Sequence, residues 1–103
     1  MDRQEIYASL AEEYGFDISV VNHCVETLSF YDFARDGEEE QFLTCLQMVL
    51  QSLFSMEFMV AHEHKYAETN IKHMFFDALY RVYGEIALPY IDEEYIELNE
   101  SRI

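Results

Sequence analysis

Histidine and carboxylate side chains gather in one stretch of the sequence, and these residue types can bind a metal ion. His62, Glu63 and His64 lie together, and His73 and Asp77 have the i, i+4 spacing that places two ligands on one helix face. On a helix, however, the side chains of His62 and His64 point in directions about 160° apart. We interpret these histidines as helix-end residues near acids, and we predict no metal site and no cofactor.

A thiol and an imidazole are adjacent at His23 and Cys24, the residue types of a nucleophilic pair. Neighbouring residues on a helix are about 100° apart, which is poor geometry for such a pair. The sequence has no G-x-S-x-G motif, no P-loop and no G-x-G-x-x-G motif, and three glycines are too few for a phosphate-binding loop. We therefore predict that the protein is not an enzyme.

Carboxylates dominate the chemistry of this chain. Its 103 residues include 21 Asp and Glu but only 6 Lys and Arg, which gives a net charge of −15 with histidine neutral. Solubility of a small domain needs a net charge of only about 2–8 in magnitude, so a use for the negative field is expected. Because phosphates would be repelled, we expect no direct binding to nucleic acid or to an anionic membrane.

The acids are most regular near the C-terminus. Glu93, Glu97 and Glu100 have the i, i+4, i+7 spacing of one helix face, and Asp92 and Glu94 flank that row. Neighbouring carboxylates in the row would be about 6 Å apart, close to the spacing of phosphates along a nucleic-acid strand. Duplex DNA carries one charge per ~1.7 Å, so 15 charges correspond to about 25 Å of duplex.

Composition and apolar spacing predict an all-α protein. Half of the residues are hydrophobic, and only 3 Gly and 1 Pro are present, which argues against a turn-rich β-sandwich or barrel. We predict one domain over residues 1–103, a compact bundle of four to five helices. The expected helices are residues 2–14, a second from Asp17 or Ser19 through Leu28 into Tyr31 or Phe33, a third beginning near Glu38, a fourth over 66–83, and a short last helix starting at Pro89. Ala34 to Gly37 is expected to be a loop.

The third helix is expected to be central and nearly all-apolar. Residues 42–61 carry one charge, Glu57, and are long enough to cross a bilayer, but Gln47 and Gln51 interrupt them and no basic cluster flanks them. We therefore favour a helix inside a bundle. Two apolar stripes indicate that it is surrounded, either by its own chain or by a second subunit. They are Phe42, Leu46, Val49, Leu53, Met56 and Val60, and beside them Leu43, Leu50, Phe54 and Phe58.

The two cysteines, Cys24 and Cys45, fall among apolar residues at helical spacing. No secretory signal opens the chain, so we expect a cytoplasmic location and two buried, reduced thiols. Two cysteines still permit one disulfide pairing.

Residues 6–28 resemble a helix-turn-helix unit. Ala11 is the small residue of the first helix, Gly15 lies in the turn, and the apolar Val21 follows six residues later. The resemblance implies two helices joined by a tight turn, with the second helix reading DNA. The segment 17–28 contains no Lys or Arg for phosphate contacts, and we interpret the unit as a folding corner or a protein-docking surface.

These observations favour a small acidic inhibitor whose negative surface mimics nucleic-acid phosphates. It would block the basic groove of a nucleic-acid-handling defence enzyme or complex, in the manner of phage anti-CRISPR and anti-restriction proteins. Tyrosines would anchor the contact because tyrosine is enriched in binding hot spots. The expected binding residues are Glu38, Glu39, Glu40, Tyr90, Asp92, Glu93, Glu94, Tyr95, Glu97 and Glu100.

Two alternatives remain open at this point. The first is an immunity protein or antitoxin that neutralises a basic toxin such as a nuclease, which relies on the same electrostatics. The second is a non-enzymatic homodimeric adaptor, in which the third helix pairs with a second subunit.

Overall fold

The computed structural model describes the backbone of residues 2–62 and 67–91 and the side chains of residues 2–55 and 72–91. Within these ranges every regular element is helical, as the sequence predicts. The elements are α1 (Arg3–Tyr14), α2 (Ile18–Ser29), α3 (Asp32–Arg35), α4 (Glu39–His62), α5 (Ala67–Tyr83) and the 3-10 helix η2 (Gly84–Tyr90).

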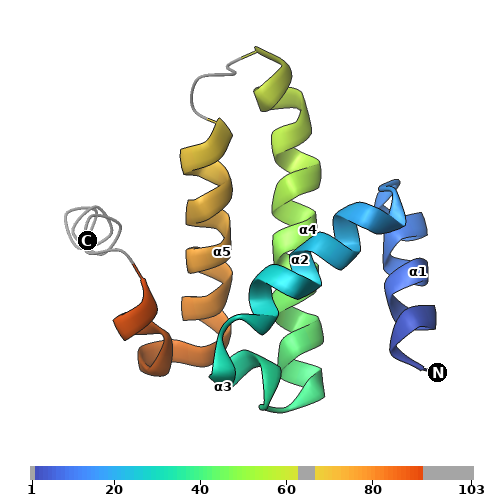
Figure 1. Ribbon diagram of the computed structural model, residues 1–103. Coiled ribbons are helices and arrows are strands. Elements are labelled where there is room, and N and C mark those ends of the chain that lie inside the picture. The colour runs from blue at the N-terminus through green and yellow to red at the C-terminus, as the bar shows by residue number, and fades with distance from the viewer. Residues whose placement is uncertain (1, 63–66, 92–103) are drawn as a thin grey trace.

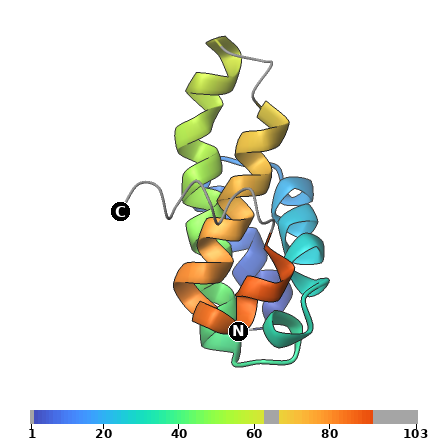
Figure 2. The same ribbon diagram turned by 90° about the vertical axis from the view of Figure 1, so that its left-hand side faces the viewer.

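The helix α4 lies at the centre of the bundle. It lies beside α5 as an antiparallel pair, while α2 crosses it and α1 packs against both α2 and α4 (Figure 1). The upper ends of α4 and α5 rise above the other helices (Figure 2). In the described part of the chain no helix has the length and apolar character needed to cross a membrane.

Both predicted stripes of α4 contribute to the core. Leu46 and Val49 of the first stripe and Leu50 of the second are fully buried, and Leu43 is partly buried against them. Phe54, one turn beyond Leu50, is 55 % exposed. Over the described side chains, then, the chain's own helices cover one side of α4, and Thr44, Gln47, Gln51 and Ser55 on its other side are exposed.

Local signals explain the corner between α1 and α2. The Asp2 carboxylate caps α1 by accepting from the Glu5 N–H at 3.0 Å, and the Asp17 carboxylate accepts from the Ser19 N–H at 3.5 Å at the start of α2. Gly15 ends α1 with φ of 74°, a left-handed conformation that glycine adopts without strain.

The predicted extension of the second helix into Tyr31 or Phe33 is wrong. The loop predicted from Ala34 to Gly37 is wrong for Ala34 and Arg35, which belong to a short helix, and is confirmed for Asp36 and Gly37. The helix α2 ends at Ser29, and one turn of helix, α3, follows. The Tyr31 carbonyl accepts from the N–H groups of both Ala34 and Arg35, at 3.0 and 2.9 Å. Because Ala34 is buried, tertiary packing stabilises this turn.

The predicted start of a last helix at Pro89 is also wrong. The chain passes from α5 through Gly84, with φ of 72°, into η2, and Pro89 lies inside that 3-10 helix. Burial of Ala87 and Ile91 against the core holds η2 in place. Residues 92–103, which include the predicted face of Tyr95 and Leu98, lie outside the described residues.

Candidate protein-docking surface

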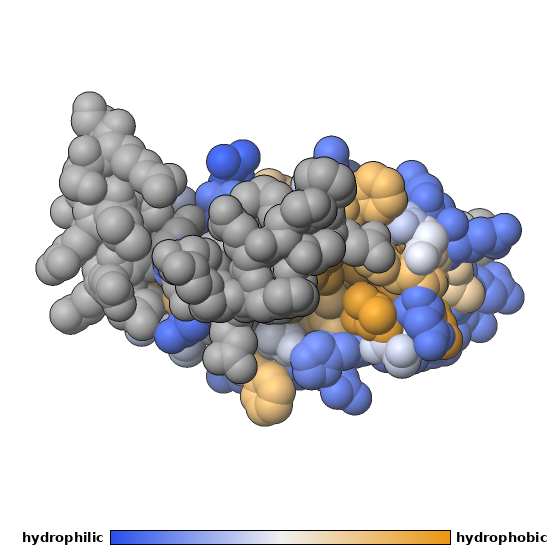
Figure 3. Space-filling model, turned by 90° about the horizontal axis from the view of Figure 1, so that it is seen from above, coloured by the Kyte–Doolittle hydropathy of each residue, from blue (hydrophilic) through white to orange (hydrophobic). Residues whose placement is uncertain are grey.

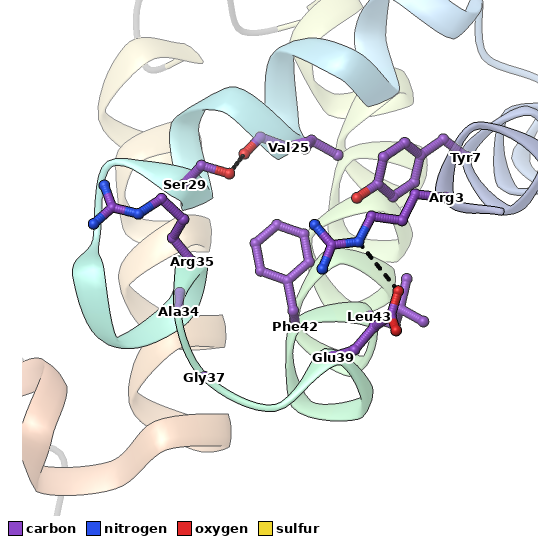
Figure 4. Close-up of a pocket in the computed structure, with 10 residues that line it drawn as sticks. All are labelled: Arg3, Tyr7, Val25, Ser29, Ala34, Arg35, Gly37, Glu39, Phe42 and Leu43. Carbon is purple, nitrogen blue, oxygen red and sulfur yellow. Dashed lines mark hydrogen bonds and ion pairs between the residues drawn. The ribbon is translucent and has the colours of Figure 1, made fainter.

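Three consecutive glutamates, Glu38, Glu39 and Glu40, mark the start of α4, and all three are exposed. Carboxylates at this position interact favourably with the positive end of the helix dipole. The Arg3 guanidinium Nε of α1 donates to Glu39 Oε1 at 3.3 Å, which joins the first turns of α1 and α4 (Figure 4). Within the described part of the chain, Glu38 and Glu40 make no ion pair.

Two further carboxylates lie immediately before these glutamates. Arg35 of α3 pairs with Asp32 at 2.8 Å and with Asp36 at 3.0 Å. The hydrogen bond from Arg35 lowers the pKa of Asp36, so this exposed carboxyl group stays ionised near neutral pH. We name Asp32, Asp36 and the three glutamates the acidic end.

The described arginines form ion pairs within the chain. Besides Arg3 and Arg35, Arg81 pairs with Asp77 at 3.1 Å. The ammonium group of Lys72 lies 5.5 Å from the centre of the Phe76 ring. These exposed ion pairs contribute little to stability, because solvent screens them. Over the described residues the unpaired charge is therefore mainly that of carboxylates.

A small cavity of about 50 Å³ lies behind the acidic end. Figure 4 shows that side chains of α1, α2, α3 and α4 meet around it, with the Arg3 guanidinium and the Tyr7 ring on one side. Ligand pockets usually measure about 300–1,000 Å³, so this cavity holds no more than solvent. The surface around it, rather than the cavity, is the candidate site.

Tyr90 is held in a cluster of aromatic rings. Its ring centre lies 5.8 Å from that of Tyr31 and 5.4 Å from that of Phe33, and Phe33 packs on Tyr83 at 5.0 Å. This cluster joins α3 to η2, yet 52 % of Tyr90 remains exposed. The neighbouring Phe30 is 83 % exposed. These rings offer apolar contact area near the aspartates of α3.

Other hydrophobic side chains also reach the surface. Seen from above, orange hydrophobic atoms lie among blue hydrophilic ones on the visible part of the protein (Figure 3). The large exposed residues are Ile18, Phe30, Phe54, Tyr80, Ile86 and Tyr90.

The structure describes four of the ten predicted binding residues. It groups Glu38, Glu39 and Glu40 at one end and places Tyr90 on η2, which the aromatic cluster connects to α3. The other six, Asp92, Glu93, Glu94, Tyr95, Glu97 and Glu100, lie outside the described residues. Sequence reasoning missed Asp32 and Asp36, although their i, i+3 and i, i+1 spacing to Arg35 was a usable signal.

Both cysteine side chains are buried, as predicted. Cys24 is 2 % exposed and Cys45 is fully buried, and both are free thiols. Burial raises the pKa of Cys24 to about 11 and that of Cys45 to about 12, so neither is a thiolate at neutral pH. Among the described residues no three His, Cys, Asp or Glu side chains converge as metal ligands. The predictions for His62, Glu63 and His64 lie outside the described side chains.

The corner that resembles a helix-turn-helix unit is present. Ala11 and Val21 are buried on either side of Gly15, while Ser19 and His23 of α2 are exposed. Since α2 carries no Lys or Arg, we keep the interpretation as a folding corner.

Comparison of the chain with protein-family models, with curated proteins and with solved structures finds no match in any of the three. A function must therefore be argued from the surface itself.

Proposed function

We propose that this protein is a non-enzymatic inhibitor that binds the basic groove of a nucleic-acid-handling enzyme or complex. Its carboxylates take the place of nucleic-acid phosphates, as in anti-CRISPR and anti-restriction proteins. The observation that carries the proposal is the acidic end. Five exposed carboxylates share one end of the molecule, and the two arginines there are already paired within the chain.

The arrangement suits recognition of Lys and Arg side chains. Among the described residues no cation pairs with Glu38 or Glu40, so neither has to give up such a pair to bind a partner's cation. Arg35 and Arg3 fix the positions of Asp32, Asp36 and Glu39 at the surface. Preformed carboxylates lose less side-chain freedom on binding, and complementary charge accelerates association.

Tyr90 supplies the apolar part of the contact. Because Tyr31 and Phe33 pack against its ring, Tyr90 presents a rigid surface with little conformational entropy left to lose. Such a ring can stack on an arginine guanidinium, a contact worth about 0.5–2 kcal/mol.

Affinity capture with defined variants tests the proposal. The tagged protein is incubated with host lysate, washed at low and then moderate salt, and the retained proteins are identified by mass spectrometry. We expect a nucleic-acid-handling protein that elutes with salt and also with added duplex DNA, because the DNA competes for the same groove. A retained protein that added duplex DNA does not elute would contradict the proposal that the carboxylates mimic phosphates.

A pair of matched variants assigns the surface. E38Q/E39Q/E40Q removes three charges from the acidic end, and E12Q/E13Q/E26Q removes three exposed charges from α1 and α2. We expect the first to weaken capture by at least about tenfold, and the second to change it little. Equal effects would show that net charge alone acts. A third variant, E93Q/E97Q/E100Q, tests the predicted C-terminal row.

The same experiment addresses the antitoxin alternative. If the retained partner is a small basic toxin encoded next to this chain, the protein is an immunity protein or antitoxin. Binding through the acidic end would then stand, and inhibition of a defence enzyme would not.

A further inference from the structure

One flank of α4 is free of charge in an otherwise highly acidic protein. Residues 41–56 contain no charged side chain. The exposed positions along this flank, Thr44, Gln47, Gln51 and Ser55, are all polar and uncharged. In a chain with net charge −15, a second acidic molecule meets less repulsion on this flank than at the acidic end.

An open groove of about 440 Å³ runs between this flank and α5. Met48, Ser52 and Ser55 of α4 and Met74 and Ala78 of α5 contribute to its walls. Small residues at helical spacing allow close approach of another helix, and methionine side chains adapt to the shape of a partner. The residues that line this groove come from α4 and α5, and none of them belongs to α1 or α2.

Among the described residues that line the groove, the charged ones are Asp77 and Arg81, which have the i, i+4 spacing and lie 3.1 Å apart. A two-fold axis that crosses α5 at the level of Leu79 would place Asp77 opposite Arg81 of the partner subunit, and Arg81 opposite Asp77 of the partner subunit. The pair is therefore self-complementary in an isologous interface.

We propose that a second copy of this chain docks in the α4–α5 groove, with the two α5 helices antiparallel across a two-fold axis. The charge-free flank removes most of the repulsion, and the Asp77–Arg81 pair sets the register. A basic partner is disfavoured here because the groove offers it no excess of carboxylates. The proposal is independent of binding through the acidic end, which lies at the start of α4 and outside this groove.

Analytical ultracentrifugation of charge-reversed variants tests the interface. The wild-type chain is expected to sediment at twice the monomer mass, and added NaCl is expected to strengthen the dimer because it screens the net charge. In D77R two arginines face two arginines across the axis, and in R81D two acids face two acids. Each variant alone is expected to raise the dimer dissociation constant by at least about tenfold.

The decisive measurement mixes the two variants. In a mixed dimer of D77R with R81D only opposite charges face each other, so a heterodimer is expected although each variant alone is monomeric. D77R/R81D should likewise dimerise as the wild type does. Loss of the pair within one chain cannot explain such a rescue, and circular dichroism confirms that each variant is helical. E26R, with the same charge change on α2, should leave the dimer unchanged.

Three results would overturn the proposal. The first is a wild-type chain that stays monomeric at every salt concentration. The second is that D77R and R81D each dimerise with the same dissociation constant as the wild type. The third is a mixture of these variants that stays monomeric. None of these results bears on capture of a basic partner by the acidic end, which added salt weakens rather than strengthens.

Discussion

The hydroxyl group of Tyr83 is buried and makes no hydrogen bond within the described residues, while its ring packs on Phe33. A buried polar group without a partner costs about 1–3 kcal/mol. Tyr83→Phe keeps the ring and removes the hydroxyl, so we expect the free energy of unfolding to rise by about 1 kcal/mol in urea titration. Tyr90→Phe is the control, because half of Tyr90 is exposed. A less stable Tyr83→Phe variant would contradict the assignment.

The buried thiols make stability depend on pH in the alkaline range. Burial raises the pKa of Cys24 to about 11 and of Cys45 to about 12, above the ordinary value of 9.0 that applies to the unfolded chain. Their contribution to stability is complete below about pH 9 and is lost as the pH rises, because the unfolded chain releases these protons first. Each thiol lowers the free energy of unfolding by up to about 1.4 kcal/mol per pH unit in this range.

Urea unfolding at about pH 8 and about pH 10 measures this dependence. Cys45→Ala is expected to be less stable at both values because it leaves a cavity, but to lose less stability between them. An unchanged difference between the two pH values would show that the Cys45 thiol does not determine the slope.

Elements long enough to show periodicity were predictable, and short ones were not. The apolar spacing and the residues Asp17, Gly15 and Gly84 predicted both ends of α1 and α5 and the start of α4 to within one residue, and gave the start of α2. A single turn such as α3 is too short for its apolar residues to show a helical period. It forms because Ala34 is buried and Arg35 bonds to aspartates on both sides, and both facts depend on packing.

The connection between α3 and α4 requires a glycine at position 37. A Cβ atom at Gly37 would lie 2.5 Å from the carbonyl oxygen of Phe33, so the backbone would have to move. We expect Gly37→Ala to lower the free energy of unfolding by about 1–3 kcal/mol, measured by chemical denaturation. It should also disturb the acidic end, which this connection positions.

Gly15→Ala tests the cost of backbone strain without a close contact, in comparison with Gly37→Ala. A Cβ atom at Gly15 meets nothing within 4 Å, but its φ of 74° costs another residue about 1–2 kcal/mol. We expect this variant to lose stability without affecting capture of a partner by the acidic end. A Gly37→Ala protein as stable as the wild type would mean that the close contact relaxes freely.

At the scale of the whole molecule, the sequence predicts how much charge there is but not where the charges meet. The three consecutive glutamates at 38–40 can be recognised in the sequence. The contact of Glu39 with Arg3 cannot, because it joins residues 36 positions apart. Asp32 and Asp36 joined the same surface only because α3 turns there. The groove between α4 and α5 likewise depends on how helices pack, which spacing along one helix does not specify.

The net charge of the chain predicts that the stability of the fold depends on salt concentration. The chain has 21 acids against 6 Lys and Arg, and few of the described acids have a cation beside them. We therefore expect repulsion to be stronger in the folded chain than in the unfolded one. Salt shortens the range of this repulsion to about 10 Å at 0.1 M. We therefore expect NaCl to raise the free energy of unfolding by about 1 kcal/mol, seen as a rise of about 4–8 °C in the thermal midpoint.

Two controls separate screening from other effects of salt on this fold. Sulfate also strengthens apolar burial, so chloride salts are used for the titration. E12Q/E13Q/E26Q removes three exposed charges that pair with no cation in the described part of the chain. This variant should be more stable than the wild type without salt and should gain less stability from NaCl. Dimer formation would add to the gain at high protein concentration, so the midpoint is compared at two concentrations. A midpoint that falls with NaCl would mean that the few ion pairs, such as Arg3–Glu39, outweigh the repulsion among the acids.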